Sequence, residues 1–246
     1  MLLFKLIKLL FENPLYFLIF FTVLTVPLLI SITVHEWAHG FVAYKFGDNT
    51  PKEQGRLSLN PFRHLDPMGT LMLFIIGIGW AKPVEINPIN IIEEKTRETG
   101  IFSVKDRYRL MLVAFAGPLS NFIMAILFSF VIYLIVTISK LKGLNPETNI
   151  TALFVMLLEI IVRINLVLGM FNLIPIPPLD GANIVRNFLP EDLSDAYFRL
   201  APYGMPILLV LIFTGGIKYL FNLADFVQIQ LLNWIAFIFD PIFKMF

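Results

Sequence analysis

The sequence predicts an all-α protein that crosses a membrane several times. Its 246 residues are 57% hydrophobic and only 15% charged, whereas soluble domains are about 45–50% apolar and about a quarter charged. Several uncharged runs reach the roughly 20 residues that a membrane-spanning helix needs. We therefore expect residues 1–246 to form a single membrane-embedded domain.

The N-terminal part predicts a short surface helix followed by a long span. Residues 1–12 are apolar apart from three charged residues on one helical face, which is typical of a helix lying in the membrane interface; these are Lys5, Lys8 and Glu12. Residues 15–46 form the predicted first span. A cleaved signal peptide is disfavoured, because the apolar run exceeds a signal core and no small-residue cleavage site follows it.

The longest polar stretch, residues 47–109, predicts a re-entrant hairpin. Segments 55–60 and 80–86 have extended, strand-like patterns, and the apolar run 68–80 between them is too short to span a bilayer. Irregular backbone at membrane depth must be shielded by protein or line a cavity. We therefore expect a short membrane-associated β-hairpin with a re-entrant segment.

The remainder of the chain predicts further spans. Residues 110–139 form the second span and residues 151–185 contain the third, which ends at a proline-rich break after Ile174. Residues 205–246 hold the C-terminal spans, with a fourth span predicted at 205–223. The sequence leaves open whether 226–246 is a fifth span or an amphipathic tail.

The distribution of basic residues predicts the orientation. Residues 45–109 carry ten Lys and Arg residues, whereas the link 140–150 carries two. Because cytoplasmic loops of membrane proteins are enriched in these residues, we expect the first loop to be cytoplasmic. The prediction is a multi-pass protein of the cell membrane, with any site at the end of the first span directed towards the cytoplasm.

One motif in the first span predicts a metal site. His35, Glu36 and His39 form the pattern H-E-x-x-H. On a helix, residues i and i+4 share a face, so the two imidazoles can bind one zinc ion while the glutamate acts as general base on a water molecule. The chain has three histidines and no cysteine. The alternative is that neighbouring helices satisfy these three side chains without a metal.

A catalytic zinc site needs a third protein ligand, and the sequence offers His64 or a carboxylate such as Asp180. The proline-rich break would bring Asp180 to the same membrane side as the histidines, but the residue could equally be the N-cap of the next helix. His64 could bind the metal in a resting state or contact substrate. Alternatively, it is a loop histidine bonded to the backbone or to Asp66.

These motifs resemble the site-2 protease family of intramembrane zinc metalloproteases. The segment Asn172–Gly181 matches the family pattern N-x-x-P-x-x-x-L-D-G, and residues 116–121 are similar to A-G-P-x-x-N. Residues 55–60 and 79–84 resemble the membrane-associated hairpin of the family. The resemblance covers roughly residues 30–185, and the short links indicate a minimal branch without PDZ or CBS domains.

The resemblance implies a three-helix catalytic core that binds one zinc ion (Zn²⁺) per chain. The implied ligands are His35, His39 and Asp180, with Glu36 as general base. Asn172 would stabilise the substrate carbonyl or its oxyanion. The implied activity is hydrolysis of peptide bonds in or near the transmembrane segments of membrane-protein or peptide substrates.

Two other classes of function remain as alternatives. A metal-binding membrane transporter could use the histidine pair, but transport requires no base beside the ligands. A non-catalytic membrane scaffold would not need Glu36 and Asp180. The net charge of +1 gives no basis for a nucleic-acid partner. The expected partners are the lipid bilayer and a transmembrane substrate, and the oligomeric state is left open.

Overall fold

The computed structural model describes residues 8–76, 81–100, 102–143 and 149–243. Within these ranges the protein is helical and contains no strand, which confirms an all-α fold. Four helices are long and apolar enough to cross a membrane: α2 (Pro14–Lys45), α7 (Val104–Leu141), α8 (Asn149–Asn172) and α12 (Ile217–Phe243).

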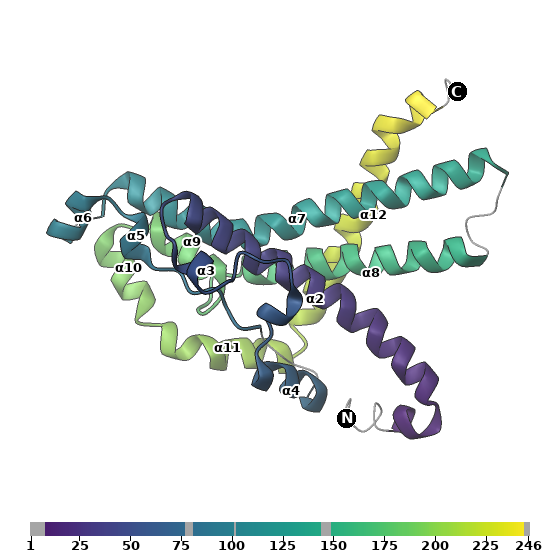
Figure 1. Cartoon of the computed structure of the whole chain (residues 1–246), viewed down its shortest axis with the longest axis horizontal. Coiled ribbons are helices and arrows are strands. Elements are labelled where there is room, and N and C mark those ends of the chain that lie inside the picture. The colour runs from purple at the N-terminus through teal and green to yellow at the C-terminus, as the bar shows by residue number, and fades with distance from the viewer. Residues whose placement is uncertain (1–7, 77–80, 101, 144–148, 244–246) are drawn as a thin grey trace.

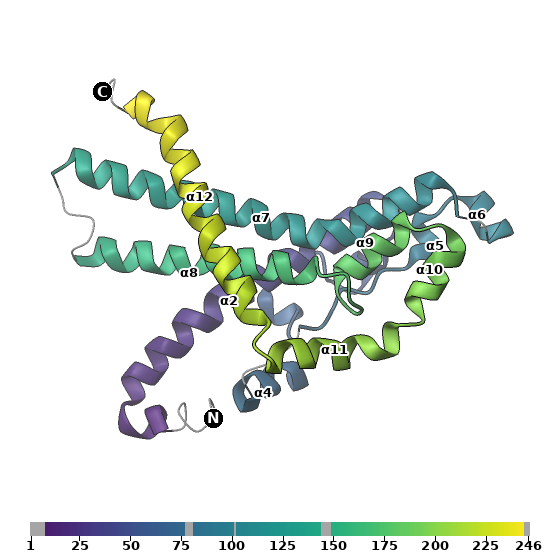
Figure 2. The same cartoon turned by 180° about the vertical axis from the view of Figure 1, so that it is seen from behind.

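The spanning helices form a bundle around α7 and α8. These two helices run side by side, α2 inclines across them, and α12 crosses both on the opposite face (Figures 1 and 2). Ala125, Val162, Leu166 and Ala224 are buried where α7, α8 and α12 meet. Small residues at such positions allow helices to approach closely, which is the main source of packing inside a membrane.

The first span begins where the sequence predicts. Asn13 caps α2 by accepting a hydrogen bond from Tyr16 N at 3.3 Å, and Pro14 occupies the first helical turn. Residues 8–12 are helical and precede this cap. The rest of the predicted interfacial helix, residues 1–7, lies outside the described residues.

The predicted β-hairpin is wrong for the part of the chain that the structure describes. Where strands were expected, the only pairing is one isolated bridge between Leu65 and Ala81. The region instead contains five short helices, which are α3 (Thr50–Glu53), η1 (Pro61–Arg63), α4 (Pro67–Ile76), α5 (Pro88–Ile91) and α6 (Glu94–Thr99).

Side-chain carboxylates explain why segment 81–87 pairs with no strand apart from the single bridge at Ala81. Val84 N donates to Glu36 Oε2 at 2.9 Å, and Asn87 N donates to Asp48 Oδ2 at 2.8 Å. These carboxylates satisfy backbone groups that a partner strand would otherwise bind. The strand-like pattern therefore reports an extended conformation and not a sheet.

The C-terminal part differs from the predicted fourth span. Residues 205–223 do not form one helix, because α11 (Ala201–Phe213) ends before a turn at Gly215, where φ is +84°. Two shorter helices precede α11, namely α9 (Asp180–Phe188) and α10 (Glu191–Phe198). The long helix after the turn, α12, is the span that the sequence left open.

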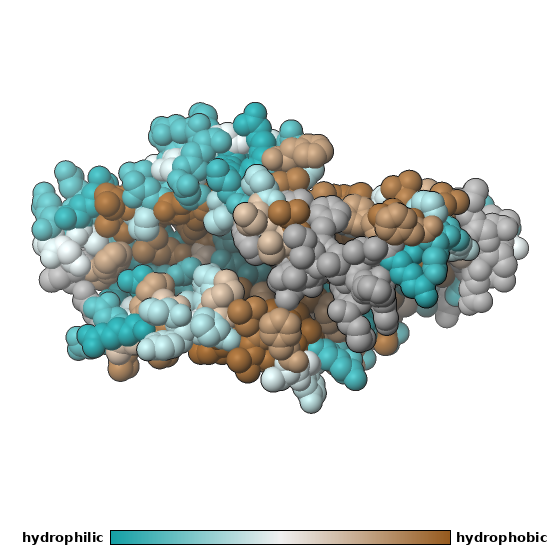
Figure 3. Space-filling view, turned by 90° about the horizontal axis from the view of Figure 1, so that it is seen from below, coloured by the Kyte–Doolittle hydropathy of each residue, from teal (hydrophilic) through white to brown (hydrophobic). Residues whose placement is uncertain are grey.

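Polar and apolar side chains are segregated along the molecule. Hydrophilic residues dominate the end where α6 and α10 lie, and hydrophobic residues are common over the middle (Figure 3). The cytoplasmic ends of α2, α7 and α8 in the predicted topology point towards this polar end (Figure 1). The fold thus places the C-terminal half of α2 between the apolar bundle and the polar end.

Candidate metal centre and active site

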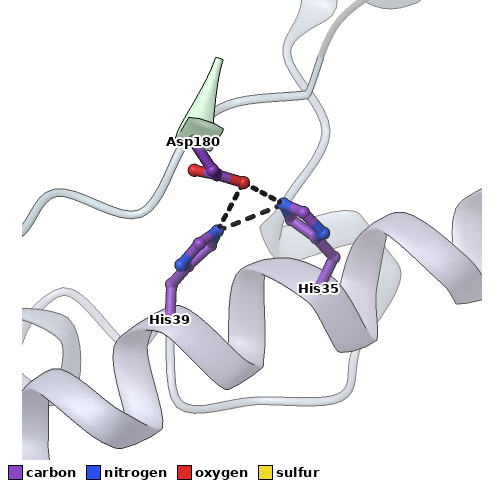
Figure 4. A group of neighbouring side chains, drawn as sticks. All are labelled: His35, His39 and Asp180. Carbon is purple, nitrogen blue, oxygen red and sulfur yellow. Dashed lines mark hydrogen bonds and ion pairs between the residues drawn. The ribbon is translucent and has the colours of Figure 1, made fainter. Parts of the chain in front are cut away.

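His35, His39 and Asp180 converge on one point. His35 Nε2 lies 3.1 Å from Asp180 Oδ2, His39 Nε2 lies 3.3 Å from the same oxygen, and the two Nε2 atoms are 3.1 Å apart. Figure 4 shows both imidazoles rising from one face of α2 towards the carboxylate, which comes from the start of α9. The i, i+4 spacing alone accounts for the alignment of the two rings.

The hydrogen bond made by His39 Nδ1 determines which of the two ring nitrogens is left to face Asp180. His39 Nδ1 lies 2.7 Å from the carbonyl oxygen of Val113. A carbonyl can only accept, so Nδ1 carries a proton and Nε2 is the nitrogen left to bind a metal. This orientation is the one that a metal-binding imidazole requires.

A chain of buried amides imposes the same orientation on His35. Its Nδ1 lies 2.7 Å from Asn121 Oδ1. Asn121 Nδ2 donates to the carbonyl oxygen of Ser31 at 3.3 Å and to Asn165 Oδ1 at 2.9 Å. Because the Ser31 carbonyl only accepts, the amide nitrogen must face it and Oδ1 must face His35. His35 Nδ1 is therefore the donor, and its Nε2 is the nitrogen left to bind a metal.

The chain of hydrogen bonds ends on backbone carbonyls in α8 and in α2 itself. Asn165 Nδ2 donates to Ser31 Oγ and to Ile161 O, both at 2.9 Å. Ser31 Oγ donates in turn to Pro27 O at 2.8 Å. Ser31, Asn121 and Asn165 are completely buried, and they join α2, α7 and α8 behind His35.

The donor set fits a zinc ion. Two imidazole Nε2 atoms face a carboxylate oxygen, and no hydrogen bond is assigned to the buried Asp180 Oδ2. So close a group of ligand atoms is stable only with positive charge among them, either a metal ion or a proton on an imidazole. Ligand atoms in tetrahedral zinc sites lie about 2.0–2.2 Å from the metal and hence roughly 3.3–3.6 Å from one another. The observed separations of 3.1–3.3 Å are close to that geometry.

Gly117 on α7 leaves room for the metal. A Cβ atom at this position would lie 2.6 Å from His35 Nε2 and closer still to His39 Nε2. Any larger residue would occupy the space in front of both ligand atoms. The glycine of the A-G-P segment is therefore a steric requirement of the site.

Asp180 is a member of the cluster and not the N-cap of α9. The N-cap is Leu179, and Asp180 is the first residue of the helix. Its neighbour Gly181 allows the preceding loop to fold back, because a Cβ there would lie 2.6 Å from Ile174 O. This return of the chain brings the carboxylate to the histidines.

A cavity of about 610 Å³ opens onto the cluster, and its walls include His35, Glu36, His39, Asn172 and Asp180. Glu36 Oε2 accepts a hydrogen bond from Val84 N, so the extended segment borders the cavity. Additional polar residues from α9 and α10 line the same space; they are Asn183, Arg186, Asn187, Ser194 and Asp195. The cavity is large enough for several residues of a peptide.

Asn172 and His64 occupy different environments. Asn172 lines the cavity, and its Nδ2 donates to Leu168 O at 3.0 Å within α8. His64 is buried, its Nε2 donates to Ser58 O at 2.8 Å, and it does not belong to the three-residue cluster. The backbone-bonded alternative for His64 agrees with this contact.

Sequence reasoning missed the buried chain behind His35. Gly117 and Asn121 stood out only as part of the segment 116–121 that resembles A-G-P-x-x-N, and Ser31 and Asn165 were not singled out. A signal for Asn165 does exist, since a lone amide inside an apolar helix must find a hydrogen-bond partner on a neighbouring helix.

Comparison with known proteins identifies the family. The model of peptidase family M50 matches residues 23–213. A relative from Bacillus subtilis, named "Putative zinc metalloprotease YwhC", is 36% identical over 220 residues, which are 89% of this chain and 93% of the relative. A Mycobacterium tuberculosis relative, "Putative zinc metalloprotease Rip2", is 28% identical over 86% of this chain and 78% of its own.

No solved structure matches the chain significantly. The family match covers most of the chain and includes every member of the cluster. Together with four apolar helices, these findings support a zinc enzyme of the membrane over a transporter or a scaffold. The chain therefore belongs to peptidase family M50, the site-2 proteases, and is an intramembrane zinc metalloprotease.

Proposed function

We propose that this protease hydrolyses peptide bonds in or near the transmembrane segments of membrane proteins, with Glu36 as general base. The observation that supports this proposal most strongly is the position of the cluster. His35 and His39 lie within a spanning helix, and a cavity of about 610 Å³ opens directly onto them. A membrane-embedded site of this kind admits a polypeptide at the level of the bilayer.

His35, His39 and Asp180 would hold one zinc ion, which when bound polarises water and the scissile carbonyl. Glu36 is adjacent to His35 and lines the same cavity. Its carboxylate would take the proton from the attacking water and pass it to the leaving nitrogen. Its Oε2 accepts the hydrogen bond from Val84 N, and the other carboxylate oxygen, Oε1, could accept the proton from water.

We assign Asn172 the role of oxyanion donor. Its amide has two N–H groups, and the one in use bonds to Leu168 O within the same helix. The second N–H is available to the carbonyl oxygen of a bound substrate. Removal of one such donor in comparable enzymes costs about 2.7–4 kcal/mol of transition-state stabilisation.

The substrate must be extended where it is cut. A peptide bond within an intact helix is shielded by the helix's own hydrogen bonds, so a transmembrane substrate has to unwind before Glu36 can direct water to it. The polar residues of α9 and α10 in the cavity wall could bind the backbone groups that unwinding exposes.

We further propose that the site faces the cytoplasm of a cell membrane. The support is the excess of Lys and Arg in residues 45–109 over the link 140–150. Because the chain has no native cysteine, the variants Lys52→Cys and Lys142→Cys can be labelled individually in intact cells and in lysed cells. We expect external reagent to label position 142 only; labelling of both positions from the same side contradicts the topology.

Cleavage mapping tests the proposed substrate class. The purified protein is reconstituted with zinc and a panel of single-span peptides, and products are located by mass spectrometry. We expect cuts within or at the edge of the apolar segment, and none in a soluble peptide carrying only the flanking residues. Cleavage confined to the soluble peptide, or zinc uptake into vesicles without cleavage, would refute the proposal.

A further inference from the structure

A second cavity lies on the other side of the segment that borders the active site. It is an open cavity of about 630 Å³, lined by the loop after α3, the start of α4 and residues Lys82 and Glu85. Pro83 and Val84, between those two residues, line the active-site cavity instead. One extended segment therefore separates the two spaces.

The walls of this second cavity carry three cations and one carboxylate, namely Arg56, Arg63, Lys82 and Glu85. Glu85 Oε2 accepts a hydrogen bond from Gln54 Nε2 at 2.6 Å. Within the described part of the chain, no carboxylate forms an ion pair with any of the three cations. The cavity thus has an uncompensated positive charge.

The burial of Arg56 makes this unpaired positive charge destabilising. Its side chain is only 5% exposed, and its recorded partner is the carbonyl oxygen of Arg63. Arg63 Nη1 similarly donates to Gly55 O at 3.3 Å. These bonds orient the guanidinium groups without neutralising them. A buried cation lacking a carboxylate is destabilising, and an anion in the cavity would relieve that cost.

Exposed apolar side chains include Phe62 in the wall of this cavity and others close to its lining residues in sequence. Phe62 is 78% exposed and Leu59 is 63% exposed, while Met68 and Leu71 at the start of α4 are about half exposed. Helix α4 lies at the edge of the molecule, away from α7 and α8, in both views of the chain (Figures 1 and 2). Apolar side chains beside basic ones are typical of a surface immersed at the membrane interface.

We propose that Arg56, Arg63 and Lys82 bind the phosphate of an anionic phospholipid headgroup. Guanidinium groups match the geometry of phosphate oxygens, and basic pockets at the cytoplasmic interface attract anionic lipids. Phe62 and the exposed residues of α4 would contact the acyl chains. These apolar neighbours favour a lipid over a soluble phosphate or an acidic peptide, neither of which would cover them.

The binding is independent of proteolysis and can be measured without it. The full-length protein is placed in neutral phosphatidylcholine nanodiscs containing increasing fractions of phosphatidylglycerol, and bound phosphatidylglycerol is counted by native mass spectrometry. Each basic residue near an anionic surface contributes roughly five-fold to binding. We therefore expect Arg63→Gln/Lys82→Gln to bind phosphatidylglycerol about thirty-fold more weakly than the unaltered protein.

The matched control is Lys52→Gln/Lys95→Gln, which removes the same charge from exposed residues outside the cavity. It should retain phosphatidylglycerol, and zinc content should be unchanged in both double variants. If Arg63→Gln/Lys82→Gln does not fold, the single variant at the exposed Lys82, Lys82→Gln, should still bind about five-fold more weakly.

Four results would overturn the lipid site. The two double variants could lose phosphatidylglycerol equally, which would indicate a general charge effect, or neither could lose it. Excess glycerol phosphate could displace the lipid completely, which would indicate a soluble phosphate. Finally, an acidic peptide from a substrate's flanking region could bind in a way that depends on Lys82, while phosphatidylglycerol binding does not. That result would assign the cavity to substrate.

Discussion

Gly117→Ala offers a steric test of the metal centre. A Cβ at this position would lie 2.6 Å from His35 Nε2 and 2.7 Å from His35 Cε1, where ordinary contacts begin near 3.4 Å. The overlap of about 0.8 Å must be relieved by rotating an imidazole or by separating α7 from α2. Either movement displaces a ligand nitrogen by a large fraction of the zinc–nitrogen bond length of about 2 Å.

The expected loss of zinc affinity is large. Removing a partner that merely orients a ligand typically costs 10–100-fold in metal affinity, and displacing the ligand atom itself should cost at least as much. We therefore expect Gly117→Ala to weaken zinc binding by about 100-fold or more, which is about 2.7 kcal/mol. Competition with a fluorescent zinc chelator measures this affinity in detergent.

Gly169→Ala is the matched control in the neighbouring helix. Its Cβ would lie 3.1 Å from the ring of Phe122 and 3.3 Å from Pro118 O, so the same chemical change requires shifts of only a few tenths of an ångström. This variant should bind zinc as tightly as the unaltered protein. If Gly117→Ala binds zinc normally, the metal does not lie between His35 and His39 in the manner described.

The remaining predictions concern the buried amides and a capped turn. Asn165→Ala should weaken zinc binding by 10–100-fold, because it breaks the chain of hydrogen bonds that orients His35. The control Asn187→Ala, whose amide bonds within its own helix, should leave zinc binding unchanged. Equal zinc affinities of the two variants would refute an orienting role for the chain of hydrogen bonds. Burial alone would raise the pKa of Asp48, but hydrogen bonds from Thr50, Asn90 and Asn87 outweigh it and lower that pKa. This stabilisation is present above the unfolded pKa of about 3.9 and is lost as pH falls through the folded pKa. Asp48→Asn should therefore reduce the melting temperature at neutral pH, and the melting temperature of the variant should fall less on acidification than that of the unaltered protein. A difference in melting temperature between the two proteins that stays constant across pH contradicts this.

Local spacing made two of the three residues of the metal site predictable. His35 and His39 are one helical turn apart, so their convergence depends only on α2 being a helix. Asp180 is contributed by a different element, and from position alone it could have been a ligand or a cap. Its role depended on how the proline-rich loop returns, which only the packing of the loop against Gly181 settles.

Interactions between distant segments were not predictable. The chain of hydrogen bonds through Asn165 depends on which face α8 turns towards α2 and α7. The sequence of a mostly apolar helix does not specify that orientation. The expected hairpin failed for a similar reason, since Glu36 and Asp48 bind the N–H groups that a strand would use. The division of 205–223 depends on the left-handed turn at Gly215, which had no stronger sequence signal than other glycines in apolar runs.

The central claim is that Glu36 is the base and not a ligand. The most direct measurement is zinc content and initial cleavage rate determined on the same preparations of the unaltered protein and Glu36→Gln. The account predicts one zinc per chain in both, with a rate for the variant that is lower by about 10²–10⁴, the usual contribution of general-base catalysis. Loss of zinc from the variant, or cleavage at the unaltered rate, would contradict it.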